Sequence, residues 1–256
     1  MNIEKQLTIV ITGATSGFGK AMAESLSKEN AKLILVGRRE DRLKKLHEEI
    51  KCSAYILPLD VSDREAVNNA FKNLPTDFSD IDVLVNNAGL SLGFGPAYEN
   101  QIDDWEVMIN TNIKGLLYCT QSVLPSMVYK NQGHIINIGS IAAVYPYHGG
   151  NVYAGSKAFV YHFSLNLRAD LQGTRVKVSC INPGMAKTEF AEVRYKGDKE
   201  KSEFLYYNRK PLEANDIAEA VIWCIKKPQH VNINSIELVS LDQPFSLGFN
   251  APVLKN

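Results

Sequence analysis

Residues 7–19 read LTIVITGATSGFG, and this stretch decides the fold. Its first five residues are rich in β-branched side chains and are bounded by a glycine turn, which predicts a buried strand. From Ser16 to Asn30 the apolar residues recur at helical spacing, which predicts a helix. A strand that runs through a glycine-rich turn directly into a helix is typical of the first unit of a parallel α/β sheet.

The turn between this strand and this helix carries three glycines in the spacing GxxxGxG. Because glycine has no Cβ atom, the backbone can turn tightly and come close to a pyrophosphate at the positive end of the helix dipole. A glycine triplet alone is also compatible with an ordinary strand-to-helix turn. Its place between a strand and a helix favours a dinucleotide site instead. The residues of this loop that we expect to contact the nucleotide are Gly13, Thr15, Ser16, Gly17, Phe18 and Gly19.

Strand and helix patterns alternate along the rest of the chain. Further strands are expected at residues 32–36, 54–59, 83–85, 134–138, 176–181 and 235–239. Further helices are expected at 41–50, 63–73, 105–129, 152–171 and 216–227, and Pro125 is expected to kink or end the helix at 105–129. This order predicts an α/β fold with a doubly wound parallel β-sheet flanked by helices on both faces, the Rossmann fold. With no internal repeat and no linker, residues 1–256 are expected to form a single domain.

The charge balance excludes several kinds of partner. The 256 residues include 28 Lys and Arg against 28 Asp and Glu, so the formal net charge is zero. This argues against a broad basic surface for nucleic acid and against a polybasic membrane anchor. No apolar run reaches the roughly 18 residues that span a bilayer, and residues 1–6 lack a signal-peptide pattern. The four cysteines lie far apart without metal-binding spacing, which predicts no metal site and reduced thiols in the cytoplasm.

Two arginines, Arg38 and Arg39, follow the second expected strand. An NAD-binding unit usually has an acidic residue here for the ribose hydroxyls, whereas arginine accommodates a 2′-phosphate. The position therefore predicts NADP as the cofactor, with a solvated basic turn as the alternative. Asp60 and Val61, at the end of the third strand, could meet the adenine edge. Alternatively Asp60 could cap the next helix, which Ser62 and Asp63 could also do.

Tyr153 and Lys157 lie four residues apart in the helix expected at 152–171, so they share a face. A tyrosine with its ordinary pKa of about 10 is a poor base at neutral pH. Because a nearby ammonium favours the phenolate, we expect the pKa of Tyr153 to fall by about two to three units in a cleft beside an oxidised nicotinamide. Tyr153 could then accept the proton of an alcohol as hydride leaves carbon, or donate it to a carbonyl in the reverse direction. The same spacing also occurs in ordinary surface pairs.

Two polar residues add to this candidate centre. Ser140 follows the fifth expected strand, where its hydroxyl could hydrogen-bond the substrate oxygen. Asn112 lies inside the helix expected at 105–129, although Asn is a mediocre helix former. Its side chain, or a locally opened backbone carbonyl, could hold a water molecule next to Lys157 and so form a proton path.

Together these residues resemble the short-chain dehydrogenase/reductase family over nearly the whole chain. The matching segments are TGATSGFG at 12–19, NNAG at 86–89, Asn112, Ser140, Tyr153-x-x-x-Lys157, and Pro183-Gly184 followed by Thr188. The resemblance implies that the catalytic tetrad is Asn112, Ser140, Tyr153 and Lys157. It also implies that Asn87, Ala88 and Gly89 lie against the cofactor, and that Pro183, Gly184 and Thr188 wrap the carboxamide end of the nicotinamide.

A narrower resemblance is to the NADP-dependent 3-hydroxy acid dehydrogenases, a group that includes serine and L-allo-threonine dehydrogenases and malonic semialdehyde reductases. It is carried by VGRR at 36–39, LVNNAGL at 84–90, GGNVY at 149–153, SLNLR at 164–168, TEF at 188–190, VRYKGD at 193–198 and HVNIN at 230–234. This resemblance implies interconversion of a small 3-hydroxy acid and its 3-oxo acid by hydride transfer. The plain spacing from Pro183 to Thr188 departs from that group, in which an extra glycine-rich stretch often precedes TEF, so the choice of substrate stays open.

The segment 189–209 interrupts the alternation of strands and helices and is expected to be a substrate loop or lid. A 3-hydroxy acid carries a carboxylate, so a cation should meet it. Arg194 or Lys196 in this loop could do so, and both could equally be solvated loop charges. Tyr147, with Tyr145 and His148, is expected to line the substrate pocket together with Ser140 and Tyr153.

The family resemblance also implies assembly, because its members form dimers or tetramers by pairing long helices and the C-terminal strand. We therefore expect a homotetramer. Two other functions stay open: a short-chain reductase for another ketone, sugar or 3-oxoacyl substrate, and an NADP-binding regulatory protein without catalysis. The intact set of Asn112, Ser140, Tyr153 and Lys157 argues against the regulatory protein.

Overall fold

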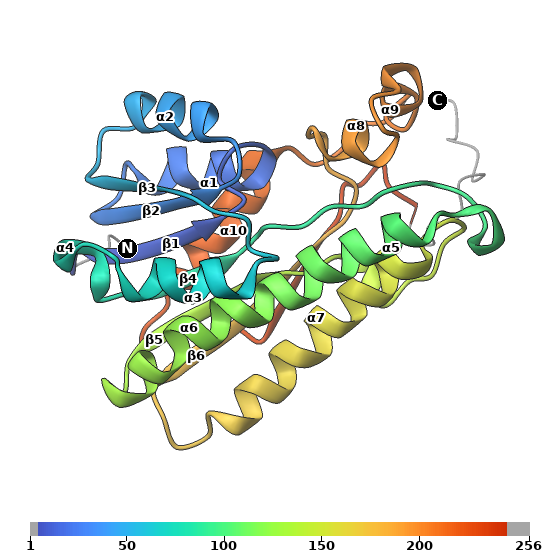
Figure 1. Ribbon diagram of the computed structural model, residues 1–256. Coiled ribbons are helices and arrows are strands. Elements are labelled where there is room, and N and C mark those ends of the chain that lie inside the picture. Colours follow the sequence, from blue (N-terminus) through green and yellow to red (C-terminus); the bar gives the residue numbers. More distant parts are fainter. Residues whose placement is uncertain (1–4, 245–256) are drawn as a thin grey trace.

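Seven parallel strands form one sheet in the computed structural model, which describes residues 5–244 (Figure 1). Their order is β3-β2-β1-β4-β5-β6-β7. The strands are β1 (Leu7–Thr12), β2 (Ala31–Gly37), β3 (Ala54–Pro58), β4 (Val83–Asn86), β5 (Gly133–Ile138), β6 (Val176–Pro183) and β7 (Ser235–Leu238). This confirms the predicted α/β, doubly wound fold. The predicted domain span of 1–256 includes residues 1–4 and 245–256, which lie outside the described residues.

Helices cover both faces of the sheet (Figure 1). Alternate side chains of β1 divide between these faces: Ile9 and Ile11 pack with α1, α2 and α10, whereas Val10 packs with α3, α6 and α7. The two buried clusters explain why the strands read as nearly continuous apolar runs. The α-helices are α1 (Gly17–Leu26), α2 (Glu40–Glu49), α3 (Arg64–Lys72), α4 (Thr76–Ser79), α5 (Ile102–Ile109), α6 (Leu116–Tyr129), α7 (Asn151–Asp170), α8 (Phe190–Arg194), α9 (Lys199–Phe204) and α10 (Ala214–Ile225).

The direction of winding reverses at β1, which lies between β2 and β4. The connection that leaves β1 leads to β2 on one side, and β4 continues to β5 on the other side. In open parallel sheets of this kind, the diverging connections leave a crevice at the carboxyl ends of the strands. The glycine loop after β1 and the NNAG segment after β4 therefore face the same crevice.

The helix predicted at 105–129 is interrupted in the middle. α5 ends at Ile109, a π-helical turn (η2) spans Asn110–Gly115, and α6 follows it. A π turn shifts the backbone hydrogen bonds from i+4 to i+5 and is often found at functional sites. Pro125 was expected to kink or end the helix; the end is wrong, because α6 continues through Pro125 to Tyr129, and the kink stays a prediction. A proline removes a single backbone donor, and the rest of this buried, well-packed helix tolerates that loss.

The segment predicted as a substrate loop, 189–209, lies between β6 and α10 and contains the short helices α8 and α9. Figure 1 shows both helices beside the carboxyl ends of the strands. The backbone of Gly93 donates a hydrogen bond to the carbonyl oxygen of Arg194, so α8 is held against the connection that follows β4. The loop thus forms one side of the crevice.

Within residues 5–244, no helix is long and apolar enough to cross a bilayer. The same residues contain no group of three or more His, Cys, Asp or Glu side chains that could hold a metal ion. All four cysteines are free thiols, of which Cys52 is half-buried and the other three are buried.

Candidate active site

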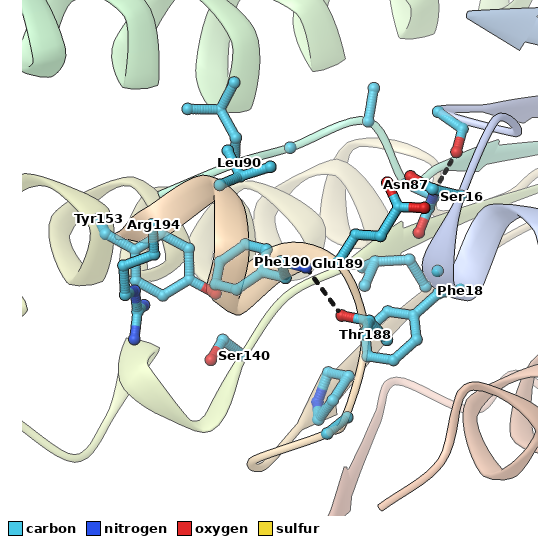
Figure 2. Close-up of a pocket in the computed structure, with 18 of the residues that line it drawn as sticks. Ser16, Phe18, Asn87, Leu90, Ser140, Tyr153, Thr188, Glu189, Phe190 and Arg194 are labelled. Atoms are coloured by element: carbon cyan, nitrogen blue, oxygen red, sulfur yellow. Dashed lines mark hydrogen bonds between the residues drawn. The ribbon is translucent and has the colours of Figure 1, made fainter. Parts of the chain in front are cut away.

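A cavity of about 390 Å³ opens at the carboxyl ends of the strands (Figure 2). It is lined by every residue predicted to bind the cofactor except Gly19, and by the predicted substrate residues Ser140, Tyr147, Tyr153 and Arg194. The predicted site residues that lie outside its wall are Gly19, Asn112, Tyr145, His148 and Lys196. The sheet thus brings segments that are far apart in the sequence to one crevice.

The glycines of the loop after β1 have different tasks. Gly13 (φ +68°) and Gly17 (φ +51°) adopt left-handed backbone conformations that other residues rarely take. A Cβ atom on Gly19 would collide with the carbonyl oxygen of Gly13 and would lie 2.7 Å from Nδ2 of Asn87. Gly19 therefore lets the first turn of α1 pack onto the loop. It lies outside the cavity wall, and its contact with the cofactor stays a prediction.

The NNAG segment is tied to the glycine loop by hydrogen bonds. Thr12 Oγ1 accepts from the backbone nitrogens of Asn87 and Ala88, each at 2.9 Å. Asn87 Nδ2 donates to the carbonyl oxygen of Thr12 at 2.8 Å. These bonds hold the connections after β1 and β4 together as one wall of the cavity, where Asn87, Ala88 and Gly89 were expected.

Arg38 and Arg39 both line the cavity, as predicted. Arg39 donates hydrogen bonds through Nη2 to the hydroxyls of Thr15 (2.8 Å) and Ser16 (2.9 Å), so its guanidinium lies against the glycine loop. Arg38 is more exposed and lies 3.7 Å from a carboxylate oxygen of Asp60. Both arginines therefore lie at the place where the sequence predicts a 2′-phosphate, and the guanidinium of Arg39 is held there by hydrogen bonds.

Two residues at this place were missed. Arg42, one helical turn after Arg39, donates through Nη1 to both carboxylate oxygens of Glu189, at 2.9 and 2.8 Å. Arg39 Nη1 contacts the same carboxylate at 3.3 Å. Burial alone would raise the pKa of Glu189, but the hydrogen bonds and charges of Arg42 and Arg39 lower it. The spacing of Arg39 and Arg42 on one helix face was a signal for Arg42, whereas nothing local pointed to Glu189.

Asp60 and Val61 line the cavity, as predicted for residues near an adenine edge. The alternative, that Asp60 caps the following helix, is not met, because Asp63 accepts the capping hydrogen bond from the backbone of Ala66. Asp60 Oδ1 instead accepts from the backbone nitrogen and the hydroxyl of Ser62. Its carboxylate is thereby fixed at the rim of the cavity.

Tyr153 and Lys157 are both buried on one face of α7. Nζ of Lys157 lies 5.9 Å from the centre of the Tyr153 ring and donates a hydrogen bond to the carbonyl oxygen of Ile138 at 2.8 Å. Ser140 follows β5 and lines the same cavity. The three side chains predicted to do the chemistry therefore line one cavity, Ser140 from the end of β5 and the other two from α7.

The groups of the protein do not by themselves lower the pKa of Tyr153, which is predicted to fall beside an oxidised nicotinamide. Burial raises the pKa of Tyr153 to about 12, because the low-dielectric surroundings disfavour the phenolate. The charge of Arg194 and a hydrogen bond with Ser140 act in the opposite direction. Burial also lowers the pKa of Lys157 to about 8. A lowered pKa of Tyr153 thus needs further positive charge in the cavity, which Lys157 alone does not provide.

Asn112 lies in the π turn and its side chain is fully engaged. Oδ1 accepts from the backbone nitrogen of Leu90 and Nδ2 donates to the carbonyl oxygen of the same residue, each at 2.9 Å. Nδ2 also donates to Ser156 Oγ at 3.0 Å. Of the two arrangements predicted for a proton path, this leaves the backbone carbonyl of the π turn, because the side chain holds the connection after β4.

Arg194 is buried in the wall of the cavity, so the prediction of a solvated loop charge does not hold for it. Its Nε donates to Ser91 Oγ at 3.1 Å and its Nη2 donates to Tyr147 Oη at 3.0 Å. Its guanidinium carbon lies 5.0 Å from the centre of the Tyr153 ring and 5.1 Å from that of Phe190. Figure 2 shows Arg194 beside Tyr153.

The other residues expected near the substrate lie elsewhere. Lys196 forms an ion pair with Asp104 at 2.7 Å and lies outside the cavity wall. Tyr145 is 3.4 Å from a carboxylate oxygen of Glu237, and His148 packs against Phe94, both outside the cavity. Of Tyr145, Tyr147 and His148, which were expected to line the pocket, Tyr147 alone lines the cavity.

Comparison with known proteins points to one family. The profile of the short chain dehydrogenase family matches residues 7–199. The NADP-dependent 3-hydroxy acid dehydrogenase YdfG of Salmonella typhi is 50% identical over 241 residues, which cover 94% of this chain and 97% of that protein. The serine 3-dehydrogenase of Rhizobium radiobacter is 48% identical over 239 residues, 93% of this chain and 96% of that protein.

A solved structure gives the same result. The closed form of serine dehydrogenase complexed with NADP+ superposes on this chain with a TM-score of 0.92 at 48% identity. The superposition covers 96% of this chain and 99% of that one. The similarity therefore extends over nearly the whole chain.

Proposed function

Because this chain belongs to the short chain dehydrogenase family and is an NADP-dependent enzyme that acts on alcohol groups, we propose that it interconverts a small 3-hydroxy acid and its 3-oxo acid. The substrate is of the serine, L-allo-threonine or 3-hydroxypropionate type. One observation carries this proposal: the buried guanidinium of Arg194 lies 5.0 Å from the ring centre of Tyr153 in one cavity. A 3-hydroxy acid needs a cation at such a short distance from the group that handles its hydroxyl proton.

The cavity fits NADP on its own geometry. A Cβ atom on Gly13 would lie 2.9 Å from Asn87 Nδ2, so the glycine keeps open a cradle of backbone at the start of α1. Arg38 and Arg39 provide guanidinium groups for a 2′-phosphate. When bound, NADP supplies the acceptor or donor of the hydride. The residues that would hold it are Gly13, Thr15, Ser16, Gly17, Phe18, Arg38, Arg39, Asp60, Val61, Asn87, Ala88, Gly89, Tyr153, Lys157, Pro183, Gly184 and Thr188.

Tyr153 acts as the acid and base. In the oxidation, its phenolate oxygen accepts the hydroxyl proton of the substrate as the C–H hydride departs, and in the reduction its hydroxyl returns a proton to the alkoxide. The hydroxyl of Ser140 hydrogen-bonds the reacting oxygen. The buried ammonium of Lys157, fixed on the carbonyl oxygen of Ile138, provides positive charge below the tyrosine.

A proton must also pass between Tyr153 and solvent. Lys157 and the backbone carbonyl of Asn112 in the π turn are the groups that could relay it through a water molecule. The side chain of Asn112 and the ammonium of Lys157 both lie against Gly89, where an added Cβ atom would be 3.3 Å from Oδ1 and 3.5 Å from Nζ, so the π turn that carries this carbonyl is held close to the lysine. The two residues therefore approach one another at the same glycine.

Arg194 receives the substrate carboxylate. Its Nε and Nη2 already bind Ser91 and Tyr147, so the guanidinium has a fixed orientation and its remaining N–H groups are available to an anion. Because desolvation of a guanidinium is costly, a buried arginine with two neutral partners is well suited to an anionic ligand. Tyr147, which lines the same cavity, forms the neighbouring wall of the substrate site.

The enzyme works as a homotetramer in the cytoplasm. Support for assembly comes from apolar side chains exposed on the long helices, such as Val107 and Ile109 of α5 and Phe159 of α7. Support for a reducing compartment comes from the four free cysteines. Sedimentation at micromolar concentration tests the assembly: a species of 28.5 kDa would contradict it.

Two experiments test the proposed reaction. Tyr153→Phe should lower turnover by at least about 100-fold because it removes the proton carrier, while NADPH binding, followed by fluorescence, is retained. Tyr145→Phe, outside the cavity, is the control. Steady-state rates with serine, L-allo-threonine and 3-hydroxypropionate should exceed those with acetoacetyl thioesters and diketones. A preference for the neutral carbonyls would contradict the assignment of a 3-hydroxy acid, and turnover by Tyr153→Phe would contradict the mechanism.

A further inference from the structure

The charge of Arg194 is held in place without being cancelled. The side chain is 9% exposed, and its two hydrogen-bond partners are the hydroxyls of Ser91 and Tyr147. Neither hydroxyl is charged at neutral pH. In surroundings of low polarity, an uncompensated cation acts strongly on any ionisable group within a few ångströms.

Besides Tyr147, which Arg194 already hydrogen-bonds at 3.0 Å, a second ionisable group close to the guanidinium is Tyr153. The guanidinium carbon of Arg194 is 5.0 Å from the centre of the Tyr153 ring, whereas Nζ of Lys157 is 5.9 Å from it. The arginine is therefore at least as well placed as the lysine to favour a negative charge on this ring. It reaches the tyrosine from α8 in the substrate loop, and Lys157 reaches it from within α7.

The other groups around Tyr153 come from the connection between β5 and α7 and from α8. Ser140, after β5, provides a hydrogen bond that favours the phenolate, and Tyr147 is a second, neutral phenol that disfavours it. Burial raises the pKa of Tyr153, and among these neighbours the charge of Arg194 is the strongest influence that lowers it. Phe190, the other α8 residue in contact, is apolar and packs 5.5 Å from the tyrosine ring.

We propose that Arg194 is a positioning residue for Tyr153, whose guanidinium stabilises the phenolate from the substrate loop. The proposal rests on the proposed role of Tyr153 as acid and base. It follows that Arg194 stabilises the phenolate of Tyr153 only when α8 is docked against the cavity. Closure of the substrate loop and ionisation of the base are therefore coupled. A substrate carboxylate on the same guanidinium shields its charge, and Tyr153 becomes a stronger base when the hydroxyl proton arrives.

The test measures the ionisation of Tyr153 directly, in the complex of the full chain with NADP+ and without substrate. The ring carbons of tyrosine carry an isotope label, the signal of Tyr153 is assigned by its absence in Tyr153→Phe, and its chemical shift is followed with pH. In Arg194→Gln, which keeps polar hydrogen-bonding atoms but no charge, the pKa of Tyr153 should rise by about one unit, a tenfold loss of phenolate at a given pH. An unchanged pKa would overturn the proposal.

Two further variants separate charge from structure. Arg194→Lys, which keeps the charge and loses the planar fork, should retain most of the effect. Lys196→Met removes a cation two residues away that is paired with Asp104, and should leave the pKa of Tyr153 unchanged. Should Arg194→Gln fail to fold, Arg194→Met provides the uncharged variant. An equal rise in Lys196→Met and Arg194→Gln would mean that loop disturbance, not the guanidinium, acts on Tyr153, which also overturns the proposal.

A non-reactive carboxylate distinguishes this proposal from the proposed function. Propionate added to the NADP+ complex should raise the pKa of Tyr153 in the unaltered protein and have no effect in Arg194→Gln, because the anion shields the guanidinium. If propionate has no effect but Arg194→Gln still raises the pKa, the carboxylate site of the proposed function fails and the role of Arg194 toward Tyr153 stands. If Arg194→Gln leaves the pKa of Tyr153 unchanged while Tyr153→Phe abolishes turnover, the role of Arg194 toward Tyr153 fails and the proposed role of Tyr153 as acid and base stands.

Discussion

Arg42 and Glu189, which lie 147 positions apart in the chain, are joined through both carboxylate oxygens of the glutamate at 2.9 and 2.8 Å. Arg42 belongs to the first turns of α2, and Glu189 is the first residue of the substrate loop. The pair connects the segment that follows β2 with the segment that follows β6. It therefore links the expected 2′-phosphate site to the loop that carries Arg194.

Loss of this ion pair should loosen the substrate loop. Both side chains are nearly half exposed, so the pair is worth about 0.2–1 kcal/mol, and Arg42→Ala should increase the open population by at most about fivefold. Limited proteolysis within residues 189–209 measures this population, because the short helices α8 and α9 must open before cleavage. Lys44→Ala, which breaks an exposed pair with Glu40 on the same helix, is the matched control. Identical cleavage rates for the two variants would show that the pair does not hold the loop.

Bound ligands should reduce the open population of the substrate loop. NADP together with a 3-hydroxy acid should protect residues 189–209 from cleavage, because both ligands contact residues of this loop or of the cavity wall that it closes. Unchanged cleavage in their presence would count against a lid. Protection by NADP alone in Arg42→Ala would show that the cofactor closes the loop without the ion pair.

Much of the fold was predictable because each strand and helix has a characteristic pattern of apolar residues within a short stretch of sequence. Strands of β-branched residues and amphipathic helices alternate, and the topology of parallel sheets then places the glycine loop, Ser140 and Tyr153 at one edge. The pair of Tyr153 and Lys157 was predictable for the same reason, since the helical spacing alone puts them on one face. Local pattern and topology are therefore enough to predict the place of a site residue that a regular strand or helix carries.

The remaining parts of the site depend on contacts between distant segments. In the π turn at Asn110–Gly115, Asn112 hydrogen-bonds the backbone of Leu90, 22 positions away, and no local pattern shows this contact. Lys196 and Arg194 look alike in the sequence, yet one pairs with Asp104 at the surface and the other is buried. The path of an irregular loop decides between them, and contacts with residues 103 and 147 positions away in the chain help to set that path.

The two arginines after β2 should decide between NADP and NAD. Each charge-assisted hydrogen bond to a phosphate contributes about 1.5–3 kcal/mol, so Arg38→Ala or Arg39→Ala should weaken NADPH binding about ten- to hundredfold. NADH, which has no 2′-phosphate, should lose much less affinity. Fluorescence titration with both cofactors measures the ratio, and Lys45→Ala on the same helix serves as the control. An equal loss for NADPH and NADH would contradict the placement of the 2′-phosphate.

Gly19 should be irreplaceable for packing, not for contact with the cofactor. In Gly19→Ala, the added Cβ atom would collide with the carbonyl oxygen of Gly13, so α1 must shift away from the loop. We expect a destabilisation of about 1–3 kcal/mol, typical of overpacking, with a parallel loss of NADPH affinity. Gly95→Ala, whose added Cβ meets only a carboxylate oxygen of Glu99 at 3.8 Å, should be nearly neutral. Urea unfolding compares the two variants, and an unaffected Gly19→Ala would contradict this packing.

His134 should make the protein less stable in mild acid. It is buried in β5, with Nε2 2.9 Å from Ser179 Oγ, and burial together with the charge of Lys177 lowers its pKa well below the ordinary value. The folded protein thus keeps this histidine neutral, whereas the unfolded chain takes up a proton at its ordinary pKa of about 6.5. Stability contributed by this residue is therefore complete above about pH 6.5 and falls by up to about 1.4 kcal/mol per pH unit below it.

His134→Gln should remove this dependence on pH, because glutamine does not titrate. We expect the loss in free energy of unfolding between about pH 7 and 5.5 to be about 1 kcal/mol smaller in the variant than in the unaltered protein, whatever the cost of the substitution itself. Urea unfolding at the two pH values measures the difference. His162→Gln, at an exposed position of α7, should leave it unchanged. Equal pH dependence in His134→Gln and the unaltered protein would mean that the folded state binds a proton at His134 after all, which its packing against Ser179 and Lys177 argues against.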